Sequence, residues 1–237
     1  MKLIPCIAFA VSAVSAAQAE VALPFGAAGG PPRAPWHVAG LPKQIPPLTT
    51  FSVVDLDGQR AVRIEADASY GNLVHALTPP RPLAQLAWRW RADELIEAQD
   101  LRTKAGDDAA LKVCVFFDLS LDKVPFVERQ LLRYARTQSS EPLPAATVCY
   151  VWDAHLPIGT ALANAYTRRV RYKVLQSGAP RLHRWTAERR DIAADFIELF
   201  GDEAREVPPV TGVAVGADAD NTGAHSLAHV ADVVLVP

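Results

Sequence analysis

Residues Val207–Pro237 read VPPVTGVAVGADADNTGAHSLAHVADVVLVP, and they contain two apolar runs separated by an acidic segment. The runs, Val210–Val215 and Leu227–Val236, have the length of strands and are rich in valine, which crowds a helix but packs well on a pleated sheet. The segment between them, Gly216–Gly223, consists of turn formers and of side chains that carry oxygen ligands. We therefore predict two strands of one sheet joined by an acidic loop.

The Asp57-Gly58 pair predicts a tight hairpin turn, because these residues readily adopt the positive φ angles that such a turn requires. Its strands would be the flanking runs Phe51–Leu56 and Arg60–Ala66. Apolar alternation predicts further strands at Leu73–Leu77, Leu83–Arg91, Ala109–Asp118, Thr147–Asp153, Thr167–Gln176 and Leu182–Glu188. The apolar positions expected to be buried in the core include Trp88, Trp90, Val113, Val115, Val170, Tyr172 and Val174.

Two segments carry apolar residues at helical rather than strand spacing. Pro125–Thr137 begins at a proline, which suits the first turn of a helix, and Arg190–Phe200 is followed by Gly201, a common C-terminal signal. Eight or nine strands with two helices, and no regular alternation between them, indicate a mainly β fold. We predict that residues 51–237 form a single domain, an antiparallel, jelly-roll-like β-sandwich with two short helical insertions.

Two segments of different character precede this domain. Residues 1–19 contain a basic start, an apolar run and a small-x-small AQA site, which together predict a signal peptide that ends at Ala19. The run is shorter than the roughly 20 residues that a membrane-spanning helix needs. Residues 20–50 are rich in proline and glycine, so we expect an arm without regular elements, in which Trp36 docks on the domain. The mature chain is therefore predicted to be periplasmic or secreted, without a transmembrane segment.

The net charge of the chain and the positions of its cysteines limit the classes of function that the protein can have. Removal of residues 1–19 changes the formal charge from −2 to −3, because Lys2 is the only charged residue of that segment. This balance disfavours a nucleic-acid binder. Cys114 and Cys149 then remain, both in apolar runs, where they either form a disulfide, as an exported chain permits, or stay free and act as small hydrophobic residues. The sequence leaves both alternatives open, because it does not place the two Cα atoms within bridging distance.

Six motifs are specific when they are taken together: WRWR (88–91), KAGDDAALKV (104–113), YVWD (150–153), NAYTRRVRY (164–172), ERRDIAADF (188–196) and DADN (218–221). Through these motifs the chain resembles the exported bacterial domain-of-unknown-function family numbered 3047, over most of its length from about Phe51 onward. That family has no established activity, so the resemblance assigns no catalytic residue. At the level of the fold alone, the strand, acidic loop and strand at the C-terminus are similar to the closing strands of jelly-roll carbohydrate-binding modules.

Two groups of acidic residues are candidate ligand sites. Asp218, Asp220 and Asn221 offer carboxylate and amide oxygens on a loop flanked by glycines, and such hard donors suit Ca²⁺, which would be structural here. The alternative is an Asx-type turn, whose side chains hydrogen bond to their own backbone. Asp107 and Asp108 immediately precede a strand and would lie at the rim of a sheet, either as ligand-binding groups or in an ordinary structural loop.

Basic side chains occupy polar positions on four of the alternating strands: Arg63, Arg89, Arg91, Lys112, Arg169, Arg171 and Lys173. If these strands share a sheet, the planar fork of arginine would suit carboxylate-bearing or sulfated polymers. The alternative is an ordinary solvated sheet face that is charged for solubility. The predicted groove is lined by Arg89, Arg91, Arg169 and Arg171.

The sequence contains no recognisable catalytic motif and therefore leaves open whether the protein is an enzyme. The first hypothesis is binding of a carbohydrate or an acidic envelope polymer on the basic face. The residues expected to contact this ligand are Arg89, Arg91, Arg169, Arg171, Lys112, Tyr150, Asp107 and Asp108. A second hypothesis is a polysaccharide-cleaving enzyme, a lyase or glycoside hydrolase, whose acids would be Asp107, Asp108 or Asp153 and whose tyrosine would be Tyr150 or Tyr172. A third is an envelope structural protein without a small ligand.

Overall fold

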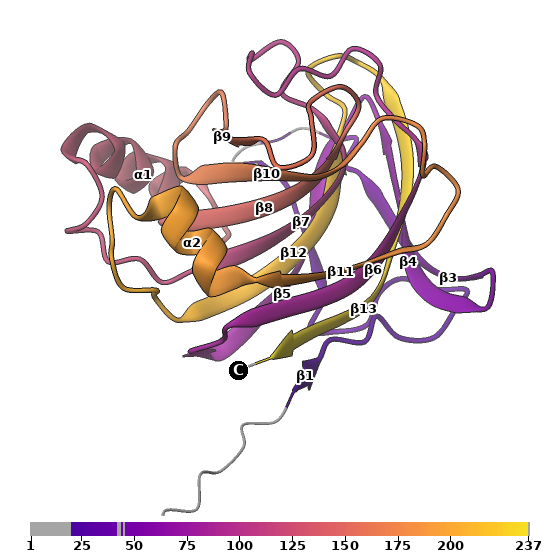
Figure 1. Ribbon diagram of the computed structural model, residues 1–237, viewed down its shortest axis with the longest axis horizontal. Helices are drawn as coiled ribbons and strands as arrows, with labels where there is room; N and C mark the ends of the chain where they lie inside the picture. Colours follow the sequence, from indigo (N-terminus) through magenta and orange to yellow (C-terminus); the bar gives the residue numbers. More distant parts are fainter. Residues whose placement is uncertain (1–19, 42–43, 45, 237) are drawn as a thin grey trace, which may run out of the picture.

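The computed structural model describes residues 20–41, 44 and 46–236, which fold as two β-sheets packed face to face (Figure 1). The predicted signal peptide, residues 1–19, lies outside the described residues. The six-stranded sheet has the order β11 (Thr186–Asp191), β6 (Gln85–Glu94), β13 (His225–Val236), β4 (Gln59–Asp67) and β3 (Thr50–Leu56), with β1 (Val21–Ala22) also paired to β13. The seven-stranded sheet has the order β2 (His37–Ala39), β5 (Tyr70–Arg81), β12 (Val210–Asp218), β7 (Ala109–Phe117), β8 (Ala146–Asp153), β10 (Val170–Ser177) and β9 (Ala161–Ala163).

This architecture confirms the predicted mainly β sandwich with two helices. The described strand pairs are antiparallel apart from β8 and β10, which run parallel. The Asp57-Gly58 hairpin forms as predicted between β3 and β4, with φ angles of 51° and 75° at its two central residues.

Both helices lie where the spacing predicts them. The first, α1 (Phe126–Gln138), begins after Pro125, and the second, α2 (Ile192–Phe200), is capped by Asp191, whose carboxylate accepts a hydrogen bond of 2.8 Å from the Ala194 N–H. Figure 1 shows α2 lying across the seven-stranded sheet, directly after β11. Among the described residues, no helix is long and apolar enough to cross a membrane.

The prediction that the two C-terminal strands share a sheet is wrong. The strand β12 lies in the seven-stranded sheet and β13 in the six-stranded sheet, so the acidic loop between them crosses from one layer to the other. The physical reason is that both runs are apolar almost throughout, which indicates burial on two faces but does not specify a hydrogen-bonding partner.

The N-terminal arm is more regular than predicted, because it contributes β1 to one sheet and β2 to the other. The expected docking of Trp36 is confirmed. Its side chain is buried, with ring centroids 4.7 Å from Phe25 and 5.0 Å from His75.

The core between the sheets is built on large aromatic side chains. Trp88 of β6 stacks on Tyr150 of β8 with 5.2 Å between ring centroids. The Trp90 ring is tilted by 56° against that of Trp152, with 5.8 Å between the centroids. All four side chains are buried, and for Trp88 and Trp90 this confirms the burial that the alternation in β6 predicts. These contacts show that Tyr150 and Trp152 of β8 point into the core. Because side chains alternate along a strand, the register with β7 and β10 then shows which of their side chains point away from the core.

Cys114 of β7 and Cys149 of β8 form a disulfide, which decides between the two alternatives left open by the sequence. They are directly opposite each other in the antiparallel register. Both lie in a small apolar cluster, with Val151 and Tyr172, that is separate from the main core. The disulfide therefore lies on the outer face of the seven-stranded sheet.

Candidate ligand-binding cleft

The outer face of the seven-stranded sheet contains a cleft of about 1000 Å³. Its floor is formed by alternate side chains of five adjacent strands, which all point away from the core. They are mainly apolar: Val74, Cys114, Phe116, Cys149, Val170 and Ala214. A sheet face with this composition needs a cover or a ligand, and three loops that line the cleft rise around its edge.

The ligand was predicted to bind to the basic face of β10, which carries Arg171 and Lys173. The cleft is lined instead by the other face of β10, which carries Tyr172. Tyr172 is paired with Cys149, and Lys173 with Tyr150, in the parallel register of β8 and β10. Because Tyr150 points into the core, Lys173 and Arg171 lie on the inner side of the sheet, whereas Tyr172 faces the cleft. Tyr172 and Val174 are buried as predicted, but outside the main core, and Val170 is only half-buried.

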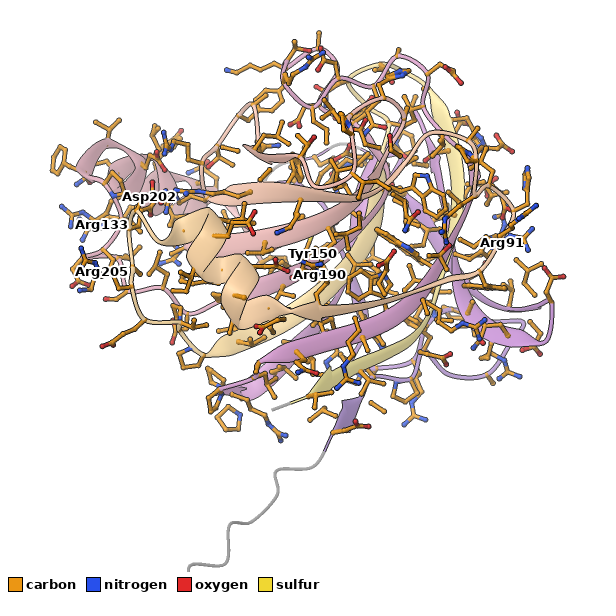
Figure 2. The ribbon with its side chains drawn as sticks, in the orientation of Figure 1. Arg91, Arg133, Tyr150, Arg190, Asp202 and Arg205 are labelled. Carbon is orange, nitrogen blue, oxygen red and sulfur yellow. A yellow bond between two sulfur atoms is a disulfide. The ribbon has the colours of Figure 1, made fainter. Side chains whose placement is uncertain are left out.

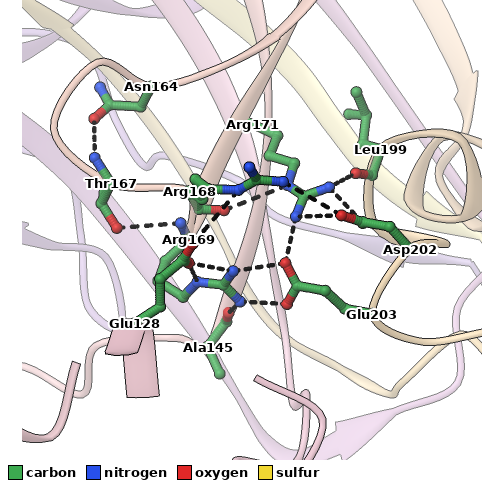
Figure 3. Close-up of polar contacts among 10 residues, drawn as sticks. All are labelled: Glu128, Ala145, Asn164, Thr167, Arg168, Arg169, Arg171, Leu199, Asp202 and Glu203. Carbon is green, nitrogen blue, oxygen red and sulfur yellow. Dashed lines mark hydrogen bonds and ion pairs between the residues drawn. The ribbon is translucent and has the colours of Figure 1, made fainter. Parts of the chain in front are cut away.

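Arg169, directly before β10, and Arg171 of β10 are covered by α2, by the turn that follows it and by Glu128 of α1 (Figure 3). The Arg169 guanidinium lies 2.6 Å from Glu203 and 2.5 Å from Glu128, and Arg171 lies 2.7 Å from Asp202 and also pairs with Glu203. Arg169 and Arg171 are both buried. The prediction that they leave the core for solvent is wrong, because carboxylates more than 30 residues away in the sequence close over them.

The other two predicted groove arginines lie on a different sheet. Arg91 of β6 in the six-stranded sheet is 2.7 Å from Asp93 and also pairs with Asp57, and Arg89 is 4.0 Å from Asp232. Figure 2 shows Arg91 at the right-hand side of the molecule, far from the helices at the left. A single groove lined by all four arginines is therefore ruled out by the strand order, and their carboxylate partners explain how the charges are tolerated.

Tyr150, another predicted ligand contact, is a core residue. It has no exposed surface, and its hydroxyl donates a 2.8 Å hydrogen bond to Asp195 of α2. Figure 2 places it in the interior beside Arg190. It therefore has no access to a ligand in the folded protein.

The predicted acidic residues and Lys112 come together at one end of the cleft. The Lys112 ammonium, buried on the cleft face of β7, lies 2.6 Å from Asp218 and 4.5 Å from the centroid of the Tyr70 ring. Burial raises the pKa of Asp218 to about 6, although the Lys112 charge opposes this shift. Burial also raises the pKa of Asp107, against the effect of its hydrogen bond from Asn164.

Asp108 points away from Asp107 and holds the acidic loop. Its carboxylate accepts hydrogen bonds from the backbone N–H of Asn221 at 3.1 Å and of Thr222 at 2.8 Å. The DADN loop is thus closed mainly by an acid 113 residues earlier in the chain, rather than only by its own side chains. Asp108 has this structural role, and Asp107 faces the cleft.

The predicted Ca²⁺ ligands are only partly brought together. Carboxylate oxygens of Asp108, Asp218 and Asp220 lie within 4.8 Å of one another, but the Asn221 amide oxygen accepts a 2.8 Å hydrogen bond from the Tyr166 hydroxyl. Lys112 competes for Asp218, and burial, together with the nearby Asp108 charge, raises the pKa of Asp220. A structural Ca²⁺ at this loop therefore stays a prediction.

Three residues that line the cleft wall were not predicted from the sequence to contact a ligand: Asn164, Tyr166 and Tyr70. The amide oxygen of Asn164 accepts from the Tyr166 and Thr167 N–H groups at 2.9 and 3.0 Å, and this leaves its NH₂ group to donate to Asp107 and, at 2.8 Å, to the Tyr172 hydroxyl. Asn164 and Tyr166 belong to the NAYTRRVRY motif, but an asparagine before a predicted strand indicates a turn and not a site.

The fold and the cleft define a two-sheet β-sandwich with a ligand-sized opening on one sheet. Residues 34–234 match the family described as "Protein of unknown function (DUF3047)", and the chain belongs to this family. No curated protein sequence matches the chain.

Three solved structures are distantly similar to the chain. CBM29-2, a family 29 carbohydrate binding module solved as a mutant, is 10% identical over 92% of this chain and 91% of its own, with a TM-score of 0.38. Endoglucanase 3 of Trichoderma harzianum, from family GH12, is 8% identical over 86% of this chain and 98% of its own, with a TM-score of 0.40. The cellulose induced protein Cip1 is 11% identical over 84% and 90%, with a TM-score of 0.32.

Proposed function

We propose that this protein binds a neutral carbohydrate in the cleft on the outer face of the seven-stranded sheet. The observation that carries the proposal is the composition of the cleft, with an apolar floor beneath a wall of tyrosines, amides and carboxylates. A sugar ring presents apolar C–H faces and a periphery of hydroxyl groups, so it needs both kinds of surface.

Tyr166 supplies an exposed flat surface. Tyr166 is 57% exposed at the rim, and its hydroxyl is held by Asn221, which fixes the ring at the mouth. Deeper in the cleft, the Tyr172 hydroxyl is fixed by Asn164. Because the Tyr166 ring is already immobilised, it loses little conformational entropy when a ligand stacks on it.

The charges at the end of the cleft that contains Asp107, Lys112 and Asp218 favour a neutral ligand over an acidic polymer. Asp107, Asp218 and Asp220 line this end together with Lys112. Arg136 and His37 also line the cleft, but they contact the Leu143 carbonyl and Glu141. The Lys112 ammonium is already paired with Asp218. An anionic polymer would meet uncompensated carboxylates here, whereas hydroxyl groups can donate to them.

A glycan-array screen of residues 20–237, followed by calorimetry on the hits, tests the proposal. Tyr166→Ala is expected to weaken binding by about tenfold, the effect of losing one aromatic contact. Tyr134→Ala is the matched control, because Tyr134 is 67% exposed on α1 and does not line the cleft. No hit on the array, or equal losses in the two variants, would reject the proposal.

A second candidate is a polysaccharide-cleaving enzyme, and the pKa shifts in the cleft favour it. Asp107 and Asp220 both line the cleft, and burial raises the pKa of each carboxyl. A proton-donating carboxylic acid near neutral pH requires such a shift. The test is a product assay on any bound oligosaccharide: cleavage that Asp107→Asn abolishes without loss of affinity favours the enzyme, and an intact oligosaccharide favours binding alone.

We also propose that the chain is exported after cleavage behind Ala19. The disulfide between Cys114 and Cys149 supports this, because such bonds persist in oxidising compartments. N-terminal sequencing of the protein from its native host is expected to begin at Glu20, and a sequence that begins at Met1 would reject it.

A further inference from the structure

The helix α1 carries an exposed apolar surface, which we call the α1 ridge and define as Phe126, Val127, Leu131 and Tyr134. Their exposed fractions are 66%, 68%, 63% and 67%. These residues include the three most exposed of the large hydrophobic residues that the structure describes. Four such side chains on one helix form a contiguous patch, which in soluble proteins usually marks an interaction surface.

The ridge lies opposite the side by which α1 is attached to the sandwich. Leu132 is the buried residue of the helix, Glu128 pairs with Arg169 at 2.5 Å, and Arg136 donates a 2.9 Å hydrogen bond to the Leu143 carbonyl. With about 3.6 residues per turn, Leu132 points roughly away from the middle of the ridge. The helix is therefore held firmly while its apolar side stays free.

The charge of α1 indicates the chemistry of its partner. Its thirteen residues contain Arg129, Arg133 and Arg136 but only one acid, Glu128, which is engaged by Arg168 and Arg169. The helix is thus basic in a chain whose formal charge is −2. Arg133 is exposed, and Arg129 lies beside the ridge, 5.7 Å from the centroid of the Phe126 ring.

We propose that α1 is a peripheral membrane-binding helix, which inserts the α1 ridge into the interfacial region of an anionic phospholipid bilayer. An apolar side bordered by arginines is suited to this surface, because the apolar residues enter the acyl boundary while the guanidinium groups meet the phosphates. A second copy of the chain fits less well, since a two-fold contact would bring the basic border of the ridge onto itself. The proposal does not depend on what the cleft binds.

Vesicle co-sedimentation of residues 20–237 tests this proposal. We expect binding to vesicles of equal parts phosphatidylglycerol and phosphatidylcholine, and binding that is about tenfold weaker or more in high salt or with phosphatidylcholine alone. Leu131→Glu should reduce partitioning into the anionic vesicles by about tenfold or more, because it replaces one inserted apolar side chain by a charge.

The matched control is Ile158→Glu, since Ile158 is 64% exposed against 63% for Leu131 and lies outside α1. This variant should bind like the parent, and both variants should keep the parent melting temperature because neither position is buried. Three outcomes would overturn the proposal: no partitioning of the parent protein, an equal loss in both variants, or a parent dimer in light scattering that Leu131→Glu dissociates.

Discussion

Glu203 is a buried carboxylate shared by two arginines, and it explains how the inner face of β10 tolerates its charges. Its side chain is 3% exposed and lies 2.6 Å from Arg169, and it also pairs with Arg171. Arg171 stacks on Phe200, 4.1 Å from the ring centroid, so its aliphatic and planar parts also pack. Removing one member of such a group leaves charge buried without its full set of partners.

Arg171→Ala is therefore expected to lower the free energy of unfolding by about 2–4 kcal/mol. The control, Arg89→Ala, removes an arginine that is 41% exposed and 4.0 Å from its nearest carboxylate, and it should cost less than about 1 kcal/mol. Urea unfolding of the two variants measures the difference. Equal effects, or a gain in stability for Arg171→Ala, would contradict the arrangement in Figure 3.

The alternation of basic and apolar residues around Arg171 predicts the two faces of β10. It does not show which of the two faces is covered by another part of the chain. Charged side chains normally mark the solvent side, and this inference fails because Asp202 and Glu203 follow a helix that the sequence does not place over β10. By contrast, Trp88 and Trp90 were assigned correctly, since large aromatic side chains rarely cover an open surface.

The strands β7 and β8 are cross-linked beneath the cleft by the disulfide between Cys114 and Cys149, which closes a loop of 35 residues. The loop entropy predicts that the double substitution Cys114→Ser, Cys149→Ser lowers the stability by about 3–4 kcal/mol. Urea unfolding with and without reductant checks this. Reductant should destabilise the parent and leave the double variant unchanged; a parent midpoint that does not respond would contradict the cross-link.

The helix α2 is attached to the seven-stranded sheet through Asp195. Its buried carboxylate lies 2.8 Å from the Tyr150 hydroxyl, 2.9 Å from the Lys173 ammonium and 2.9 Å from Arg190. Burial opposes its ionisation, but the hydrogen bonds from Arg190, Lys173 and Tyr150 outweigh burial and lower the pKa. A carboxyl whose pKa is lowered on folding stabilises the protein above its unfolded-state pKa, and this stability is lost as the pH falls through the folded-state pKa.

The melting temperature of the parent should therefore decrease as the pH is lowered from about 5 towards 3, and Asp195→Asn should reduce this decrease while lowering the stability at pH 7. Asp232→Asn, at a carboxylate that is 54% exposed, is the control and should behave like the parent. Thermal unfolding followed by circular dichroism at each pH measures both effects. An unchanged pH profile in Asp195→Asn would show that this carboxyl does not anchor α2.

Most elements could be predicted from the sequence, but their partners could not. The Asp57-Gly58 hairpin was predictable because its strands are adjacent and the turn fixes the register. The pairing of β12 with β5 and β7, and of β13 with β4 and β6, joins segments that are distant in sequence and that carry little register information in their continuous valine runs.

The cleft forms because strands that are distant in the sequence lie next to each other in the seven-stranded sheet. Asp107 precedes β7, Lys112 lies within β7, Asp218 ends β12 and Asn164 precedes β10. The order β12-β7-β8-β10 brings these four residues together at one end of one sheet face. The sequence could identify Asp107 and Asp218 as candidates, because oxygen-donating residues at strand ends stand out, and Lys112 as a basic residue within an alternating strand. It could not place them together, nor could it exclude Tyr150, since both inferences require the layer arrangement.

Hydrogen–deuterium exchange, with and without the oligosaccharide that binds best in the array, locates the binding surface on the whole molecule. We expect the ligand to slow exchange in the loops that line the cleft, residues 141–145, 164–167 and 219–222, and to leave exchange in β6, with Arg89 and Arg91, unchanged. Slower exchange confined to the outer face of the six-stranded sheet, with no change in those three loops, would contradict it.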